Sequence, residues 1–166
     1  MPGFIVDGYG TGAALPKTVR MQHLWSIEKL GSINVRDLYA KELGLPKFTV
    51  AVEKVKGGAI EYKYASGVTW EDVTVTFYDV QGLLPEIEKW KSSVYNDASG
   101  IGASSMGYKQ DSRFALIDGQ GSVQARYTLK NSWPSQIDHG KLTYTESDAK
   151  LVTITLTYDT ATMEQV

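Results

Sequence analysis

In the stretch VTWEDVTVTFYD, residues 68–79, apolar and polar side chains alternate strictly over the second half. Val73, Val75 and Phe77 point to one side of an extended chain, and the threonines between them point to the other. Successive side chains of a strand face opposite sides of a sheet, so the pattern predicts a strand with one buried and one polar face. Threonine suits the polar face, because it is β-branched and stiff yet hydrophilic.

Two later segments repeat this alternation, SVQARYTLK at residues 122–130 and LVTITLTYD at residues 151–159. Weaker versions occur earlier, in HLWSIEKL at residues 23–30 and on either side of the Gly57-Gly58 turn. The tetrapeptide DGQG, residues 118–121, has the composition of a β-hairpin turn. The chain therefore contains several antiparallel strands.

One segment, LLPEIEKWKSSVY at residues 83–95, has the spacing of a helix instead. Leu83, Ile87, Trp90 and Val94 form a single apolar stripe at i, i+4, i+7 and i+11. A glycine- and serine-rich loop, residues 96–107, follows it. The segment VRDLYAKELGLPK, residues 35–47, is ambiguous: its apolar pattern allows a short helix, but Gly44 and Pro46 limit the length of that helix.

These elements predict two parts. Residues 1–20 contain several glycines and no hydrophobic period, which indicates an extended N-terminal arm that is disordered or orders against a partner. Residues 21–166 form one β-rich α+β domain, an antiparallel sandwich or barrel covered by a single helix. A glycine-rich nucleotide loop in the arm is disfavoured, because no helix follows Gly12.

Composition argues against several functional classes. The net charge of −2 lacks the basic excess of a dedicated nucleic-acid binder. The chain has no cysteine, which excludes disulfide scaffolds, thiolate zinc sites and cysteine nucleophiles. No apolar run is long enough to span a bilayer, and the N-terminus lacks signal-peptide character, so we expect a soluble protein made in the cytoplasm.

The stretch NSWPSQIDHGKLTY, residues 131–144, contains the residue types of a catalytic triad. Ser135, Asp138 and His139 are too close in sequence, however, because triad members usually approach from different elements. The remaining histidine, His23, is 116 positions away, so no metal site is expected. We interpret the stretch as a structural corner, in which Trp133 packs and Pro134 ends the strand ladder. No catalytic, cofactor-binding or metal-binding residue is predicted.

Several motifs together resemble the tail tube proteins of contractile-tailed bacteriophages. They are SVQARYTLKNSW followed by the W-P step of WPSQID, the final VTITLTYD strand, the GVTWED turn that leads into VTVTFYD, and the ELGLP segment. The resemblance spans roughly residues 21–160. Each motif is short, and none carries a catalytic group.

The resemblance implies a non-enzymatic virion structural protein without cofactors. Such subunits form hexameric rings that stack into a hollow tube within a contractile sheath, through which the genome passes. The implied partners are further copies of the chain, sheath protein, baseplate and tail terminator proteins, a tape-measure protein and transient DNA. The implied location is the virion tail, assembled in the host cytoplasm. Inner tubes of pyocins and type VI secretion systems are related.

The polar strand positions are the candidates for a water-filled lumen, since a channel wall must be hydrophilic. These are Thr74, Thr76, Gln124, Arg126, Thr128, Thr153, Thr155 and Thr157. The polar side of the helix is the candidate for the outer, sheath-facing surface, with Glu86, Glu88, Lys89 and Lys91. The arm and the segments near 44–58 and 96–107 are expected to bridge between subunits or rings.

Two alternatives stay open at this point. A baseplate protein that initiates the tube would use the same fold in a single ring. A monomeric β-sandwich module that binds carbohydrate or peptide would use some of the ten tyrosines at its surface.

Overall fold

The computed structural model describes residues 5–6, 17–18, 20–33, 39–96, 99–102 and 104–166. In the arm, β1 (Ile5–Val6) pairs antiparallel with β2 (Lys17–Thr18). The remainder of the predicted arm, residues 1–4, 7–16 and 19, lies outside the described residues, as do 34–38 of the ambiguous segment.

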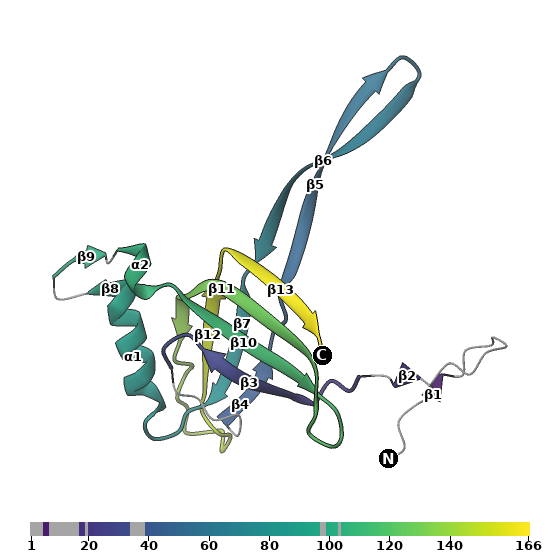
Figure 1. Ribbon diagram of the computed structural model, residues 1–166. Coiled ribbons are helices and arrows are strands. Elements are labelled where there is room, and N and C mark those ends of the chain that lie inside the picture. Colours follow the sequence, from purple (N-terminus) through teal and green to yellow (C-terminus); the bar gives the residue numbers. More distant parts are fainter. Residues whose placement is uncertain (1–4, 7–16, 19, 34–38, 97–98, 103) are drawn as a thin grey trace.

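An antiparallel sheet forms the body (Figure 1). Its strands follow the order β3-β10-β11-β12-β7-β4, and β13 also pairs with β11. Their bounds are β3 Trp25–Leu30, β4 Ala40–Leu43, β7 Val73–Tyr78, β10 Gln110–Ile117, β11 Val123–Asp138, β12 Leu151–Thr157 and β13 Thr160–Gln165. The β-rich fold and the three alternating strands predicted from the sequence are confirmed.

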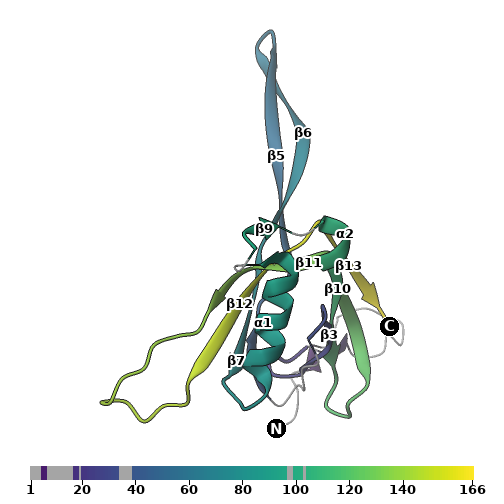
Figure 2. The same cartoon turned by 90° about the vertical axis from the view of Figure 1, so that its left-hand side faces the viewer.

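The predicted helix is α1 (Leu83–Val94), which buries Leu83, Ile87 and Trp90 against the sheet. Figure 2 shows α1 lying across the sheet. Gly31 makes room for the Trp90 ring: its φ is +52°, and a Cβ there would lie 2.3 Å from a carbon of that ring. Any side chain at this position would displace the largest buried residue of the core.

The expectation of a single helix was wrong, because the loop after α1 has structure of its own. It contains β8 (Tyr95–Asn96), β9 (Ile101–Gly102) and a short second helix, α2 (Ser105–Tyr108). The Nε1 of Trp90 donates a hydrogen bond of 3.4 Å to the backbone oxygen of Tyr108, which ties α2 to the end of α1. Glycine and serine composition does not reveal such a tertiary anchor.

The assignment of a corner at Trp133 and Pro134 was wrong in one respect, because Pro134 does not end the strand ladder. Both residues lie inside β11, paired in register with Thr157 and Leu156. The ladder tolerates Pro134 because β10 pairs no further than Ser132, and because the register against β12 shifts directly after the proline. Trp133 is half-buried and packs edge-on against Tyr108, with ring centroids 5.8 Å apart.

The real bend in β11 lies at Asn131, which has a φ of 56°. Asparagine adopts this left-handed conformation more readily than most residues. The Asn131 backbone N–H donates to Asp111 Oδ1 at 3.1 Å, and its side-chain amide donates to Asp159 Oδ2 at 2.9 Å. On one side of the bend β11 pairs with β13, and on the other side it pairs with β12.

Two more strand expectations need correction. The last alternating strand is followed by a further one, β13, which the sequence reading missed. In β3 the register against β10 shifts next to Glu28, so Ile27 and Leu30 are both buried although they are three positions apart. A bulge of this kind breaks the simple period of two.

Candidate assembly surfaces

The most exposed element is a long hairpin that projects from the body (Figures 1 and 2). It consists of β5 (Lys47–Gly57) and β6 (Ile60–Glu71), which pair only with each other among the described strands. We call residues 47–71 the hairpin. Its exposed large apolar side chains are Phe48, Val50, Val52, Val55, Ile60, Tyr62, Tyr64 and Val68.

The hairpin is attached to the body through its root. The Trp70 ring lies between Phe48, at a centroid distance of 5.4 Å, and Tyr158, at 6.0 Å. The buried hydroxyl of Tyr158 donates a hydrogen bond of 2.7 Å to the backbone oxygen of Glu71. Burial of the Tyr158 hydroxyl raises its pKa above the ordinary value, which favours the protonated, donating form.

Five of the six predicted lumen-facing threonines lie together on β7 and β12. Thr76 pairs with Thr153, their hydroxyl oxygens are 3.2 Å apart, and Thr74 pairs with Thr155. Thr157 donates to Asp72 Oδ1 at 3.0 Å. Their neighbours Val73, Val75, Val152, Ile154 and Leu156 fill the core, so the threonines occupy the opposite side of the sheet.

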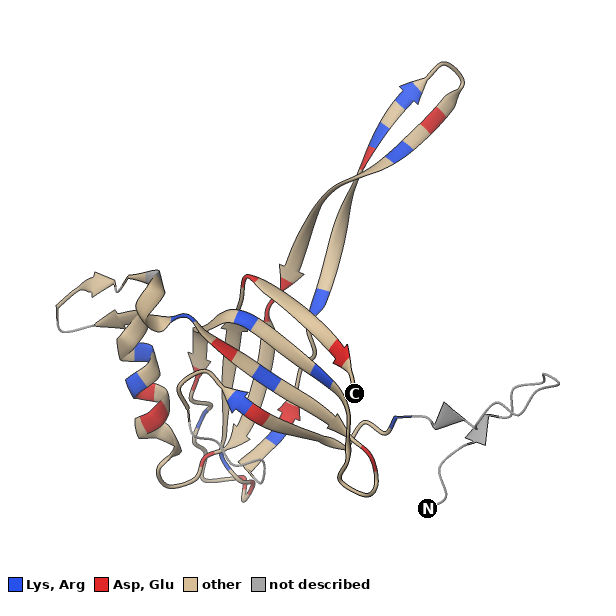
Figure 3. Ribbon diagram, viewed as in Figure 1, with Lys and Arg blue, Asp and Glu red and all other residues tan. Residues whose placement is uncertain are grey.

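The other three candidates lie on β11. Gln124 donates to Asp118, Arg126 pairs with Glu28 across the sheet, and Thr128 is only 6% exposed. The structure thus brings the five threonines of β7 and β12 into one patch. It places the β11 residues on a charged region of the same sheet, next to β3, β10 and β13 (Figure 3).

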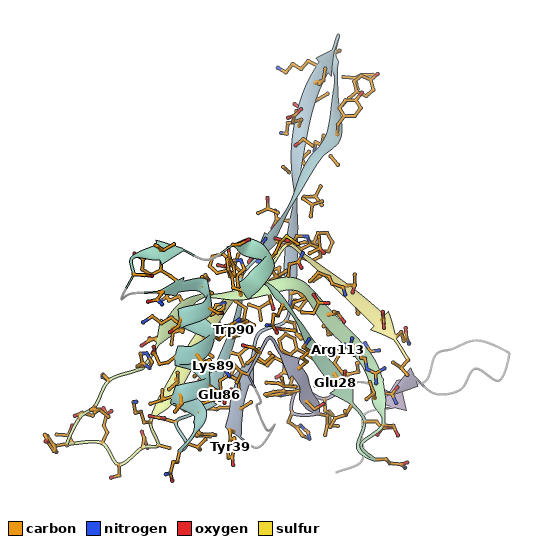
Figure 4. The ribbon with its side chains drawn as sticks, turned by 60° about the vertical axis from the view of Figure 1, so that its left-hand side comes forward. Glu28, Tyr39, Glu86, Lys89, Trp90 and Arg113 are labelled. Carbon is orange, nitrogen blue, oxygen red and sulfur yellow. The ribbon has the colours of Figure 1, made fainter. Side chains whose placement is uncertain are left out.

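Cations and carboxylates alternate across this charged region. The Arg126 Nε lies 2.9 Å from Glu28, and Arg113 shares the same carboxylate at 3.9 Å (Figure 4). Lys130 binds Asp111 at 2.7 Å. The hydrogen bond from Lys130, with a second from the Asn131 backbone, holds the pKa of Asp111 below its usual value. Paired charges of this kind leave little free positive potential for a phosphate.

The predicted outer residues lie on α1 outside its buried stripe. Lys89 is exposed, whereas Glu86, Glu88 and Lys91 are half-buried. Glu88 lies 3.6 Å from Lys91 and 3.5 Å from His139 Nε2. Figure 4 shows Glu86 and Lys89 on this helix.

The three triad-like residues do not converge. Ser135 donates to the Thr155 backbone oxygen, Asp138 accepts from the Gly140 N–H, and His139 faces Glu88. No group of three His, Cys, Asp or Glu side chains within the described residues is arranged to hold a metal ion. A surface hollow of about 450 Å³ has no carboxylate among its lining residues, Gln22, His23, Trp25, Ala40 and Lys41.

The sequence reading missed a chain of buried hydroxyls. The Gly31 N–H donates to Ser112 Oγ at 3.0 Å, Ser112 and Ser132 Oγ atoms are 2.7 Å apart, and Ser132 donates to the Gln110 backbone oxygen. Since Ser132 uses its only proton on Gln110, Ser112 must donate to Ser132. The sequence signal for this feature was a serine, Ser112, at a position of its strand where an apolar residue is expected.

The comparison with protein families decides the identity. The model of the T4-like virus tail tube protein gp19 matches residues 31–162. The chain belongs to this tail tube family. The resemblance stated from the sequence is therefore confirmed, and the match covers the hairpin and the body from β4 to the start of β13.

Solved structures show the same fold at low sequence identity. The tube-terminating cap of the anti-feeding prophage has a TM-score of 0.77 at 13% identity, covering 96% of this chain and all of that one. A sheath-tube complex of an extracellular contractile injection system has a TM-score of 0.66 at 16% identity, covering 86% and 88%. The sheath/tube terminator of that system has a TM-score of 0.71 at 14% identity, covering 91% and 99%.

Comparison with curated protein sequences gives no match. Within the described part of the chain, the helices are too short or too polar to cross a membrane.

Proposed function

We propose that this tail tube protein is the repeated, non-enzymatic subunit of the inner tube of a contractile particle. Copies form rings of six, the rings stack into a hollow conduit, and a contractile sheath surrounds it. The observation that carries this proposal is the family match over residues 31–162. The exposed apolar hairpin supports it, because a monomeric protein rarely leaves such a surface uncovered.

The threonine patch of β7 and β12 and the charged region next to it are proposed to line the channel. A wall whose cations are paired with carboxylates, such as Arg126 with Glu28 and Lys130 with Asp111, binds phosphates weakly. DNA is the proposed cargo, guided by a tape-measure protein during assembly. The α1 residues Glu86, Glu88, Lys89 and Lys91 are proposed to face the sheath.

Baseplate and terminator proteins are the proposed partners at the two ends of the tube. The proposed location is the tail of a virion assembled in the cytoplasm of its host. The N-terminal arm, residues 1–20, and the 96–107 segment are proposed to order on neighbouring copies.

Negative-stain electron microscopy of the purified chain at high concentration, with light scattering on the same sample, tests the proposal. We expect long hollow tubes or stacked rings. Discrete single rings that never stack would favour a baseplate initiator or a terminal ring instead. A chain that stays monomeric, even with a baseplate or tape-measure partner added, would contradict the proposal and favour the carbohydrate- or peptide-binding module.

A further inference from the structure

The ladder of the hairpin is interrupted partway along its length. Ala51 pairs with Gly67, and the next residue, Val52, pairs with Ala65, so Ser66 is an extra residue in β6. An extra residue of this kind is a β-bulge, which increases the local twist. The two strands cross partway along the hairpin in Figure 1. We call Ala51, Ala65, Ser66 and Gly67 the waist; the part of the hairpin between the waist and the body is the root, and the part beyond it is the tip.

The waist lacks the large side-chain pairs of the other two parts. In the root Phe48 pairs with Trp70, and in the tip Val55 pairs with Tyr62. The waist consists of two alanines, a serine and a glycine. Cross-strand contacts between side chains stabilise a two-stranded ribbon, and residues this small offer little area for them. The waist is therefore the part of the hairpin with the weakest cross-strand support.

The apolar face of the hairpin changes sides at the waist. In the root, Phe48 and Trp70 place it at the even positions of β5. In the tip, Val55 and Tyr62 place it at the odd positions, which point the other way. Root and tip thus share no continuous apolar surface that would hold them in one mutual orientation.

Gly67 adds backbone freedom at the waist. A Cβ at this position would meet no atom within 4 Å, so packing does not require a glycine. Its φ is not in the left-handed region, so the backbone conformation does not require one either. The side-chain hydrogen bond at the waist, from Ser66 Oγ to the Ala51 backbone oxygen, is 3.3 Å long and exposed. What glycine contributes here is its wide choice of backbone conformations.

We propose that the waist is a hinge, and that this hinge regulates the growth of the tube. In the free subunit the tip bends relative to the root. Assembly fixes the tip, so each added subunit loses this conformational freedom. The loss raises the concentration of free subunits needed for growth and so limits spontaneous assembly. The regulatory part rests on the tube function proposed above, whereas the hinge itself does not.

Distances between spin labels test the hinge in the free subunit. The chain has no cysteine, so introduced pairs are labelled without background. The tip pair, A59C/K89C, joins the turn of the hairpin to α1 and spans the waist. The matched root pair, T69C/K89C, ends before the waist. All three positions are exposed, and we expect a broader distance distribution for the tip pair.

Two changes should stiffen the waist. Deletion of Ser66 removes the extra residue and keeps the cross-strand partners of the residues on either side of it. Gly67→Ala removes the freedom of glycine, and its methyl group has space. Both changes should narrow the distribution of the tip pair and leave that of the root pair unchanged. A tip-pair distribution that neither change narrows would overturn the hinge.

Sedimentation tests the regulation. Gly67→Ala should lower the concentration at which tubes appear by about two- to fivefold, which corresponds to the freedom lost when glycine becomes alanine. Deletion of Ser66 should lower it too, and Ser66→Gly should raise it. The matched control is Gly119→Ala in the DGQG turn, where a Cβ also has space. This control should leave the concentration unchanged.

The outcomes separate the two proposals. If the unmodified chain never assembles, even with a baseplate partner added, the tube function and its regulation fail together, and the spin labels still decide whether the waist bends. If the chain assembles, but stiffened variants need an unchanged or higher subunit concentration, only the regulatory part is wrong.

Discussion

Strands β7 and β5 have the same alternation of apolar and polar residues, but the apolar side chains are buried in β7 and exposed in β5. Val73, Val75 and Phe77 alternate with threonines in β7, and Val75 and Phe77 are both 0% exposed. Phe48, Val50 and Val52 alternate in the same way in β5, yet Phe48 and Val52 are both 57% exposed. The first strand is covered by α1 and flanked by β12, whereas the second pairs, among the described strands, with its hairpin partner alone.

The difference shows that alternation encodes a strand with one apolar face but does not say what covers that face. In the body the cover comes from the same chain, so burial contributes to the stability of the monomer. In the hairpin none of the described segments covers the apolar face, and under the proposed function the same residue types contribute to assembly instead. Mutations in the body should therefore lower the stability of the monomer, whereas mutations in the hairpin should mainly reduce assembly.

The largest expected loss of stability comes from a substitution in β7, whose apolar side chains lie in the core. Replacing Phe77 by alanine should lower the free energy of unfolding by about 3–5 kcal/mol, because it leaves a cavity in a fully buried position. Urea unfolding followed by tryptophan fluorescence measures the change. The matched control is Phe48→Ala, which should cost less than about 1 kcal/mol because its ring is mostly exposed. Equal losses of unfolding free energy for the two variants would contradict the difference between the buried strand β7 and the exposed strand β5.

The next effect concerns the buried hydroxyl chain. Ser112→Ala should cost about 1–3 kcal/mol, because the Gly31 N–H and Ser132 Oγ each lose their partner in a buried site. Ser135→Ala serves as the control and should change stability by less than about 0.5 kcal/mol, since that hydroxyl is exposed. If Ser135→Ala abolished a measurable catalytic activity, the non-enzymatic function proposed here would be wrong.

A smaller loss of stability is expected at the root of the hairpin, where Tyr158 attaches it to the body. Tyr158→Phe removes the hydroxyl that donates to the Glu71 backbone oxygen and should cost about 0.5–1.5 kcal/mol. Without that bond, the hairpin should point in a wider range of directions. Pairs of spin labels, one at the hairpin tip and one in the body, would report a broader distance distribution. An unchanged distribution would show that the Trp70 contact alone orients the hairpin.

A pH dependence is expected from Asp111 in the body. The hydrogen bond from Lys130 lowers the folded-state pKa of Asp111, so its stabilising contribution is present above the unfolded-state pKa. The contribution is lost as the pH falls through the folded-state pKa. Asp111→Asn should therefore be less stable than the unmodified chain at pH 7, by at most about 1 kcal/mol. The gap should close in acid, and a gap that widened there would contradict the assignment.

The smallest effect on folding should accompany a large effect on assembly. Val52→Thr keeps a β-branched residue in β5 and should change the free energy of unfolding by less than about 0.5 kcal/mol. The same variant should form fewer tubes, because it places a hydroxyl on the apolar face of the hairpin. Sedimentation beside the unmodified chain measures this. Normal tube yield would mean that this face of the hairpin stays in water.

Much of the fold was predictable where the pattern was local and uninterrupted. The strands around Val75, Ala125 and Ile154 and the helix that carries Trp90 followed directly from their periodicity, and the DGQG turn closes on Asp118 as expected. The errors occurred where local rules give way to tertiary contacts. Pro134 did not end its strand, and the bulge at Glu28 interrupted the alternation of β3. The short helix α2, which was not predicted, is anchored by a hydrogen bond from Trp90.

The candidate surfaces divide in the same way. Polar alternation predicted which threonines of β7 and β12 share a face, since side-chain direction in a strand depends only on position. It did not predict that Thr128 is buried, nor that Arg126 and Glu28 meet from strands 98 positions apart. Pairing of distant strands determines those neighbours, and one sequence read along its length does not contain the register.

By itself, the sequence determined a β-rich chain with one amphipathic helix, a wall of alternating threonines and the motifs of a tail tube protein. Only the tertiary structure decided which apolar faces are covered. It buried the face of β7 beneath α1 and left that of β5 projecting into solvent. The physical reason is that periodicity is set by backbone geometry within one segment, whereas burial depends on what other segments bring to it.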